Sequence, residues 1–596
     1  MNERRLRQRI EDVRNGMHSR RAFLCDMVAL GLTAPLAAQM LAHGGVAMAA
    51  SEFKYVPTKA GGGGVLKLLW WQAPTLLNPH FAVGTKDQEG SRLFYEPLGA
   101  WDPDGNLVPI LAAEVPSLEN GTIDKDLTWV VWKLRQNVKW HDGQPFTADD
   151  CVFNWQYATD PSTAATTSGT YKDITVSKLD DHTIRIDFPK PTPFWADAFV
   201  GPRGQLIPKH LFEAYRGANS REAPTNLSAV GTGPYLFVDF KPGDLVRGRL
   251  NPNYYIENRP HFDAIEMKGG GDAVSAARAV LQTGEYAFAW NIQVEDELLK
   301  RLESGGNGHV SILPTGNLEE ILLNNTDPWK EVDGERSSLK TTHPFLTDPI
   351  VRQALNVLVD RLSVEKFIYG RTGTATANYV NNPPAFVSHD TAYAFDIAKA
   401  AEMLDKAGWK PGGDGIRAKD GVRLKIVFQT SINAPRQKTQ EIVKQACQKA
   451  GIEVELKTIP ASVYFSSDIG NPDTGSKFYA DLEMHTPTMS QPDPAEFMRA
   501  FLSTEAASKD NKWQGRNATR WNNAEYDALF HEAEHEIDPI RRAALFIRMN
   551  DLLIRSVAII PVVKRFAVAA VANQLHMRLS GWDSYVWSLR DWYADA

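Results

Sequence analysis

Short stretches of alternating apolar and polar residues dominate the first third of the chain. Residues 65–71 (VLKLLWW) follow four consecutive glycines and form a mostly apolar run, which predicts a buried strand. Residues 128–134 (TWVVWKL) and 181–188 (DHTIRIDF) alternate more clearly and predict half-buried strands. The sequence Thr-Ala-Asp-Asp at 147–150 has the pattern of a helix N-terminus. We therefore predict a helix between these two strands.

Further along the chain, helical and extended patterns take turns. Apolar positions at helical spacing predict helices over residues 274–283, 348–369, 396–404 and 435–450. Short apolar runs predict strands over residues 321–324, 424–429 and 452–456. An order in which strands and helices alternate is typical of an α/β fold.

Length and charge limit the class of protein. The chain has 596 residues, which is too many for a single compact core, so we expect two or three lobes. Its 43% hydrophobic and 23% charged residues are typical of a globular protein. The net charge of −7 comes without a basic stripe that would neutralise phosphates, and this argues against nucleic acid as a partner.

The N-terminal residues have the pattern of an export signal. Five arginines precede the sequence Ser-Arg-Arg-Ala-Phe-Leu at 19–24, and a mildly apolar stretch follows over residues 27–38. This stretch is too short for a membrane-spanning helix, which needs roughly 20 apolar residues. We predict a twin-arginine signal peptide over residues 1–49 and a free periplasmic protein. Of the three cysteines only Cys151 and Cys447 lie beyond it, so no disulfide framework is expected.

Several longer motifs occur together in one order. Residues 128–153 read TWVVWKLRQNVKWHDGQPFTADDCVF. The others are FYEPL at 94–98, GTGPY at 231–235, NPNYY at 251–255, DPIVRQAL at 348–355, QPDP at 491–494 and RWNNAEYD at 520–527. In these motifs the chain resembles the family 5 extracellular solute-binding proteins, which serve the ATP-driven importers of peptides and nickel. The resemblance covers nearly all of the chain after the signal.

The resemblance implies a fold and a role. Family members fold as an α/β flytrap of two lobes plus a small inserted domain (class II, cluster C). Here lobe I would comprise residues 65–98, 200–317 and 560–596, the inserted domain residues 99–199, and lobe II residues 318–559. The expected ligand is a peptide or peptide-like solute held between the lobes of a monomer. The expected partners are the permease and ATPase of an ABC importer at the inner membrane.

The resemblance also indicates where the ligand would lie. In peptide-binding relatives an aspartate two residues before the motif at 492–494 holds the α-ammonium of the peptide, and Ser490 stands at that position here. Because a neutral hydroxyl replaces the charge, a non-peptide solute such as a glycoside or an opine-like conjugate stays open beside a peptide.

Alternation along an extended segment predicts one uncharged, weakly polar face toward the cleft, made of Met484, Thr486, Thr488 and Ser490. The loop that corresponds to a ligand-lining loop of the relatives contains Gly84, Thr85 and Lys86. Lys86 is a candidate partner for a ligand carboxylate or phosphate, and Trp521 is a candidate stacking surface.

One motif points to catalysis instead. The sequence His531-Glu532-Ala533-Glu534-His535 fits H-E-x-x-H, in which two histidines on one helix face bind zinc. The segment is densely charged, whereas a catalytic zinc site needs a partly dry cleft. The sequence contains no nucleophile elbow, phosphate loop or dinucleotide fingerprint. We therefore expect no enzyme, no cofactor and no metal site, and keep a zinc hydrolase as the remote alternative.

Overall fold

The computed structural model describes residues 12, 23, 53–466 and 468–595 of the chain. The predicted signal peptide therefore lies, apart from two residues, outside the described part. The chain divides into two units at Val56 and Pro57, and the fold below is that of the second unit, residues 57–596. None of the helices in the described part is both long and apolar enough to cross a membrane.

The first large sheet has seven strands. Their order is β11 (Gly308–Leu313), β21 (Ala567–Ala572), β10 (Phe288–Ala289), β1 (Val65–Leu69), β9 (Ala264–Lys268), β8 (Leu245–Leu250) and β7 (Tyr235–Lys241). β1 runs parallel to both of its neighbours, while the remaining pairs are antiparallel. Helix α8 (Ala273–Leu281) packs on this sheet near β21 and β10.

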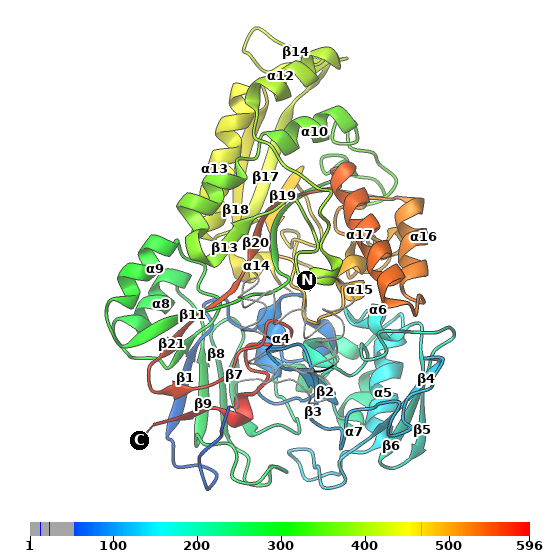
Figure 1. Cartoon of the computed structure of the whole chain (residues 1–596), viewed down its shortest axis with the longest axis vertical. Helices are drawn as coiled ribbons and strands as arrows, with labels where there is room; N and C mark the ends of the chain where they lie inside the picture. The colour runs from blue at the N-terminus through cyan, green and yellow to red at the C-terminus, as the bar shows by residue number, and fades with distance from the viewer. Residues whose placement is uncertain (1–11, 13–22, 24–52, 467, 596) are drawn as a thin grey trace. The chain divides into compact units, whose positions relative to one another are not determined.

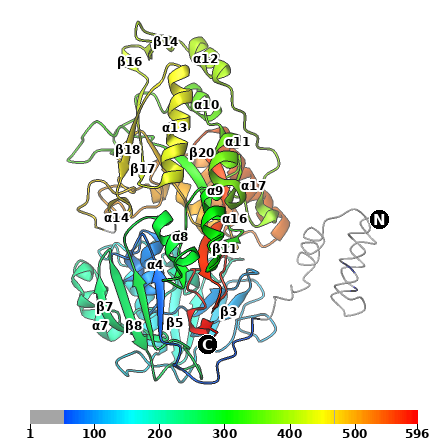
Figure 2. The same cartoon turned by 90° about the vertical axis from the view of Figure 1, so that its left-hand side faces the viewer.

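The second large sheet has six strands (Figure 1). Their order is β13 (Gly373–Ala375), β20 (Ile559–Arg565), β12 (Leu318–Leu323), β19 (Leu482–His485), β17 (Lys425–Ser431) and β18 (Glu453–Ile459). Figure 2 shows the long helix α13 (Ala434–Lys449) lying along β17 and β18. One core of this lobe lies between the sheet and the helices α10 (Pro349–Val357), α12 (Ile397–Lys406) and α13.

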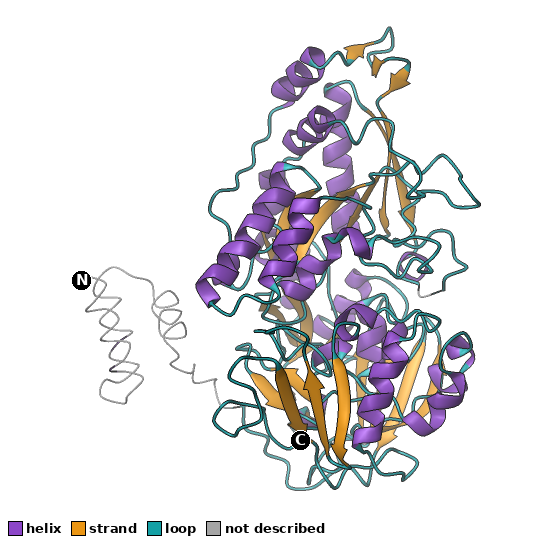
Figure 3. Ribbon diagram, turned by 90° about the vertical axis from the view of Figure 1, so that its right-hand side faces the viewer, coloured by secondary structure: helices purple, strands orange, loops and turns teal. Residues whose placement is uncertain are grey.

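A smaller domain and a group of C-terminal helices complete the unit. The inserted three-stranded sheet has the order β4 (Trp129–Lys133), β6 (Thr183–Asp187), β5 (Thr175–Asp180), and α5 (Ala148–Thr159) packs on it. The capping box predicted at Thr147 forms, with Asp150 as its second member. Helices α16 (Ala524–Ala533) and α17 (Pro539–Arg555) pack against each other, and Figure 3 shows the strand groups with the helices packed on them.

The chain passes between the two large sheets in two places. One is residues 314–317, between β11 and β12, and the other is Phe566, between β20 and β21. The two segments are joined where Thr315 Oγ1 donates to the carbonyl of Arg565 over 2.8 Å. Because β20 pairs within the second sheet as far as Arg565, we propose the return to lobe I at residue 566 and not at residue 560.

The α/β class predicted from the sequence is confirmed, and most predicted elements form within a few residues of their expected bounds. One helix is shorter than expected. The pattern over residues 348–369 predicts a single helix, whereas α10 ends at Val357, α11 covers Arg361–Val364 and a π-helical turn covers Glu365–Tyr369. The break follows from Asp360, whose side chain accepts from the backbone of Ser363 and so caps a new helix.

Candidate functional site

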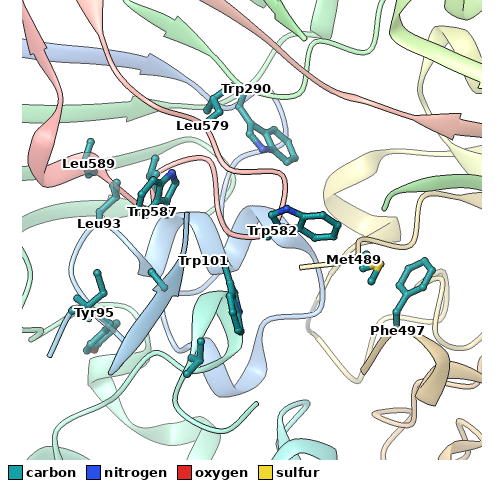
Figure 4. Packing of buried hydrophobic residues seen from close by; sticks show 14 of the residues in the cluster. Leu93, Tyr95, Trp101, Trp290, Met489, Phe497, Leu579, Trp582, Trp587 and Leu589 are labelled. Carbon is teal, nitrogen blue, oxygen red and sulfur yellow. The ribbon is translucent and has the colours of Figure 1, made fainter. Parts of the chain in front are cut away.

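A cavity of about 340 Å³ lies where the two large sheets and the two crossing segments meet. Its wall takes residues from the first lobe, such as Trp290, from the second lobe, such as Leu322 and Arg565, and from the crossing over residues 314–317, such as Thr315. Ligand sites of small solutes measure about 300–1,000 Å³, so this volume suits a small molecule. Figure 4 shows Trp290, Met489 and Phe497, which belong both to the wall and to the large buried cluster beneath it.

The predicted loop lies on this wall. Gly84, Thr85 and Lys86 all line the cavity, at the start of α4 (Thr85–Ser91). Lys86 is 1% exposed, and its Nζ atom lies 2.7 Å from Asp87 Oδ1 and 2.9 Å from Thr75 Oγ1. The ammonium of Lys86, a candidate partner for a ligand carboxylate or phosphate, is thus already paired within the protein.

The segment after β19 also reaches the cavity, but its predicted alternation is only partly correct. Thr486, Thr488 and Ser490 line the wall. Met484 does not, because it lies within β19 opposite Ile321 and both side chains pack in the core of the second lobe. Beyond the end of the strand, successive residues up to Ser490 line the cavity, so the period of two does not extend through the segment.

Trp521 is placed in the core and not on the cavity wall. Its side chain is 6% exposed and meets Tyr526 edge to face, with 5.4 Å between the ring centroids. The aromatic residues that do line the cavity are Trp290, Tyr379, Tyr464, Phe465, Phe497, Phe501, Trp513 and Tyr585. They come from segments far apart in the sequence, and no local pattern marks them as neighbours.

A buried group of ions lies at the crossing. Glu319, which is fully buried, binds Arg436 through two atom pairs of 3.0 Å and 3.2 Å, and Arg565 Nη1 lies 3.6 Å from the same carboxylate. Thr486 donates to Glu319 over 2.5 Å and accepts from both arginines. Burial alone would raise the pKa of Glu319, but the two arginines outweigh it and hold the pKa below its ordinary value.

Beside this group lies a patch of acidic residues and one histidine, formed by Glu320 on β12 and by Glu483 and His485 on β19. Glu320 pairs directly with His485, and Leu322 pairs with Glu483, so the four side chains point to one face. All four line the cavity. The opposite face of both strands carries Ile321, Leu323, Leu482 and Met484, which form core.

Burial governs the ionisation of this patch. It raises the pKa of Glu483 to about 7, and the pKa of Glu320 rises well above its ordinary value because burial and the charges of Glu319 and Glu483 act together. Burial and the nearby Arg436 lower the pKa of His485 to about 4, so this ring is neutral at neutral pH. Burial likewise raises the pKa of Glu89, on the first-lobe wall, to about 8.

A third charged group connects the lobes. Arg516, from the loop before α16, forms an ion pair with Glu496 on α15 (Ala495–Met498). Arg203 binds the same Glu496 oxygen from the first lobe over 3.0 Å. All three residues line the cavity. The wall therefore contains several charged side chains beside the uncharged face formed by Thr486, Thr488 and Ser490.

The H-E-x-x-H segment does not form a zinc site. Helix α16 ends at Ala533, so His535 lies beyond the helix that carries His531. His535 Nδ1 instead lies 2.9 Å from the carbonyl of Pro191, and the His531 side chain is 61% exposed. Over residues 53–466 and 468–595, no three His, Cys, Asp or Glu side chains are arranged to hold a metal ion. The two cysteines of this part, Cys151 and Cys447, are buried and free.

Comparisons with known proteins agree with this architecture. The family model of the bacterial extracellular solute-binding proteins, family 5 Middle, matches residues 106–509. The oligopeptide-binding protein AppA of Bacillus subtilis is 27% identical over 396 residues, which cover 65% of this chain and 67% of that relative. The glutathione-binding protein GsiB of Escherichia coli K12 is 25% identical over 503 residues, or 84% of this chain and 89% of the relative.

A solved structure supports the fold. The structure of AppA from Bacillus subtilis in complex with a nonapeptide superimposes with a TM-score of 0.77 at 23% identity, covering 90% of this chain and all of that one. The two-lobed flytrap predicted from the sequence motifs is thereby confirmed.

Proposed function

Because the chain belongs to the family 5 bacterial extracellular solute-binding proteins, we propose that it captures a peptide or peptide-like solute in the cavity between its lobes. It then delivers this solute to the permease of an ATP-driven importer. The observation that carries the proposal is the cavity itself, whose wall combines residues of both sheets with the crossings between them. A ligand that contacts both lobes at once stabilises the closed state over the open one.

The charged wall supports a peptide or a peptide-like compound over an uncharged glycoside. Arg516, Arg565, Glu320 and Glu483 line the cavity. Arg516 and Glu320 have buried atoms without a hydrogen-bond partner in the described residues, and a ligand without charges would leave them unmatched. AppA and GsiB, which are named for an oligopeptide and for glutathione, are relatives with a peptide ligand. Because Ser490 stands in place of the aspartate, other residues of the wall must bind the ammonium of the ligand.

A thermal-shift screen tests the proposal. The probes are dipeptides, reduced glutathione, disaccharides and an opine-type amino acid conjugate, added to residues 50–596. A ligand at 100 times its Kd adds about 2.7 kcal/mol of stability, which raises the Tm visibly. We expect dipeptides or glutathione to raise it. If no member of the panel does so, the proposed function fails.

Export by the twin-arginine pathway into the periplasm is part of the same proposal. It rests on Arg20 and Arg21 within the sequence Ser-Arg-Arg-Ala-Phe-Leu. Replacing both arginines with lysine keeps the charge and should leave the protein in the cytoplasm of cell fractions. Replacing Arg4 and Arg5 in the same way is the matched control and should leave export intact. Periplasmic accumulation of the first variant would contradict this part.

A further inference from the structure

Glu320 is one of several side chains of the cavity wall that carry a buried polar atom without a hydrogen-bond partner in the described residues. It is 2% exposed, and its Oε2 atom is buried without a hydrogen-bond partner in the described part of the chain. Buried polar atoms in native proteins are nearly always hydrogen-bonded, since leaving one unmatched is costly. An unmatched acceptor in the wall of a ligand cavity therefore points to a donor on the ligand.

The surroundings of Glu320 select a cation as that donor. Within residues 53–466 and 468–595, the basic side chain that lies nearest to the Glu320 carboxylate is His485, with 3.9 Å between His485 Nε2 and Glu320 Oε1. The His485 ring is neutral at neutral pH. The charged neighbours are Glu319 and Glu483, both acidic. Among the described residues, no lysine or arginine forms an ion pair with the Glu320 carboxylate, and no cation contributes to its pKa shift. An arriving ammonium meets Glu320 and Glu483 on one face, without a competing cation of the protein between them.

Arg516 offers the opposite charge. Its Nη1 atom binds Glu496, but its Nε and Nη2 atoms are buried without a partner in the described residues. These two nitrogens form one edge of the guanidinium, whose spacing matches the two oxygens of a carboxylate. The arginine is thus held in place through one nitrogen, and the unmatched edge suits a bidentate anion.

Glu320 and Arg516 both affect the pKa of Tyr379, which lies on the cavity wall. Tyr379 is buried and stacks on Phe497 with 4.3 Å between the ring centroids. Burial raises the pKa of Tyr379, Glu320 raises it further and Arg516 lowers it. Glu496, the ion-pair partner of Arg516, also raises the pKa of Tyr379, so both the acidic and the basic group lie near this ring, and all of them line the same cavity.

We propose that Glu320 and Arg516 are the two poles of a site for a zwitterionic ligand. The ligand's primary ammonium binds Glu320 with support from Glu483, and its carboxylate binds the Nε and Nη2 edge of Arg516. Glu320 gives up its proton to the solvent when the ammonium arrives. This inference rests on the proposed function and adds the chemical class of the solute and the residues that hold each end.

The experiment compares free and blocked dipeptides by calorimetry on residues 50–596. The dipeptide that raises the Tm most in the screen is used free, with its amine acetylated, and with its carboxylate amidated. We expect each block to weaken binding to the wild type by about 100-fold, because it leaves one buried charge unmatched. Equal affinity for the free and blocked forms would overturn the inference.

Two variants test which residue binds the amine and which binds the carboxylate of the dipeptide. Glu320→Gln should remove the preference for a free amine and keep that for a free carboxylate, whereas Arg516→Gln should do the reverse. Glu532→Gln, on the exposed end of α16, is the control and should change neither. Melting of the ligand-free variants shows that they fold. A Glu320→Gln variant that still prefers the free amine would also overturn the inference.

The proposed function and this inference fail in different ways. If no solute of the screen stabilises the wild type, the proposed function fails and the inference fails with it. If a disaccharide or another uncharged solute stabilises it and dipeptides do not, solute capture stands, whereas the peptide assignment and the zwitterion site are both wrong.

Discussion

Glu320 and His485 lie directly opposite each other on β12 and β19, with 3.9 Å between Glu320 Oε1 and His485 Nε2. The pair has the geometry of an ion pair without its charge, because burial keeps the ring neutral and raises the pKa of the carboxyl. If the proposed ligand site is correct, the acidic patch is a place where the ligand-free protein loses stability in exchange for binding.

This loss depends on pH. The folded pKa of Glu320 lies above that of the unfolded chain, so the unfolded state releases its proton first as the pH rises. The contribution of Glu320 to wild-type stability therefore decreases from about pH 4.5 upward, while glutamine has no proton to lose. We expect Glu320→Gln to stabilise the ligand-free protein at pH 8 by about 1–3 kcal/mol and much less at pH 5. Urea unfolding at both pH values measures the difference.

The neighbours of Glu320 set the control for this measurement. Glu319, Glu483, His485 and Tyr379 surround it and stay the same in wild type and variant, so much of their own titration cancels in the comparison. Glu532→Gln, on the surface, should give no pH-dependent difference. A Glu320→Gln effect of equal size at pH 5 and pH 8 would show that Glu320 is ionised throughout.

The motif at residues 491–494 contributes one partner of a buried ion pair. Asp493 binds both terminal nitrogens of Arg542 on α17, one of them over 2.9 Å, and both side chains are less than 10% exposed. Removing one partner leaves the other charge buried and unpaired. Arg542→Ala should therefore lower the free energy of unfolding by about 3–5 kcal/mol, measured by urea unfolding. Arg548→Ala, on the same helix, breaks only an exposed pair with Glu525 and should cost less than about 1 kcal/mol. Similar losses in both variants would contradict this assignment.

The motif at residues 94–98 contacts the motif at residues 231–235 at Gly231. A Cβ atom on this glycine would lie 1.9 Å from the backbone oxygen of Phe94, a contact that requires the backbone to move. We expect Gly231→Ala to destabilise the protein by about 3 kcal/mol or more, measured by thermal unfolding. Gly413→Ala, where a Cβ meets nothing within 4 Å, is the control and should change stability by less than about 1 kcal/mol. An unchanged Tm for Gly231→Ala would mean that the two segments separate freely.

Zinc should have no effect on this protein. His531 and His535 do not share a helix face, so adding Zn²⁺ or a chelator should leave the Tm unchanged. His531→Ala should behave like the wild type, within about 0.5 kcal/mol. A rise in Tm with Zn²⁺ that the variant abolishes would restore the metal-site hypothesis.

The sequence predicted the fold better than the site. Capping residues and apolar periods are local, so the start of α5 at Thr147 and the extent of α13 were readable from the sequence. Which face of a strand meets a cavity is not local. Met484 and Glu483 follow each other in the chain, and the pairing of β19 with β12 decides which of them is core. The ion network around Glu319 joins β12, β20 and α13, and no spacing in the sequence marks it.

The two crossings between the sheets also determine when the protein is able to fold. β20 lies between β13 and β12 in one sheet, and β21 lies between β11 and β10 in the other, so residues 559–572 are inner strands of both. Neither sheet is completed until these residues have left the ribosome, and the earlier strands stay unpaired along those edges. Stable folding of this unit therefore requires residues 559–572, and the strand edges that they pair with stay exposed until these residues are made.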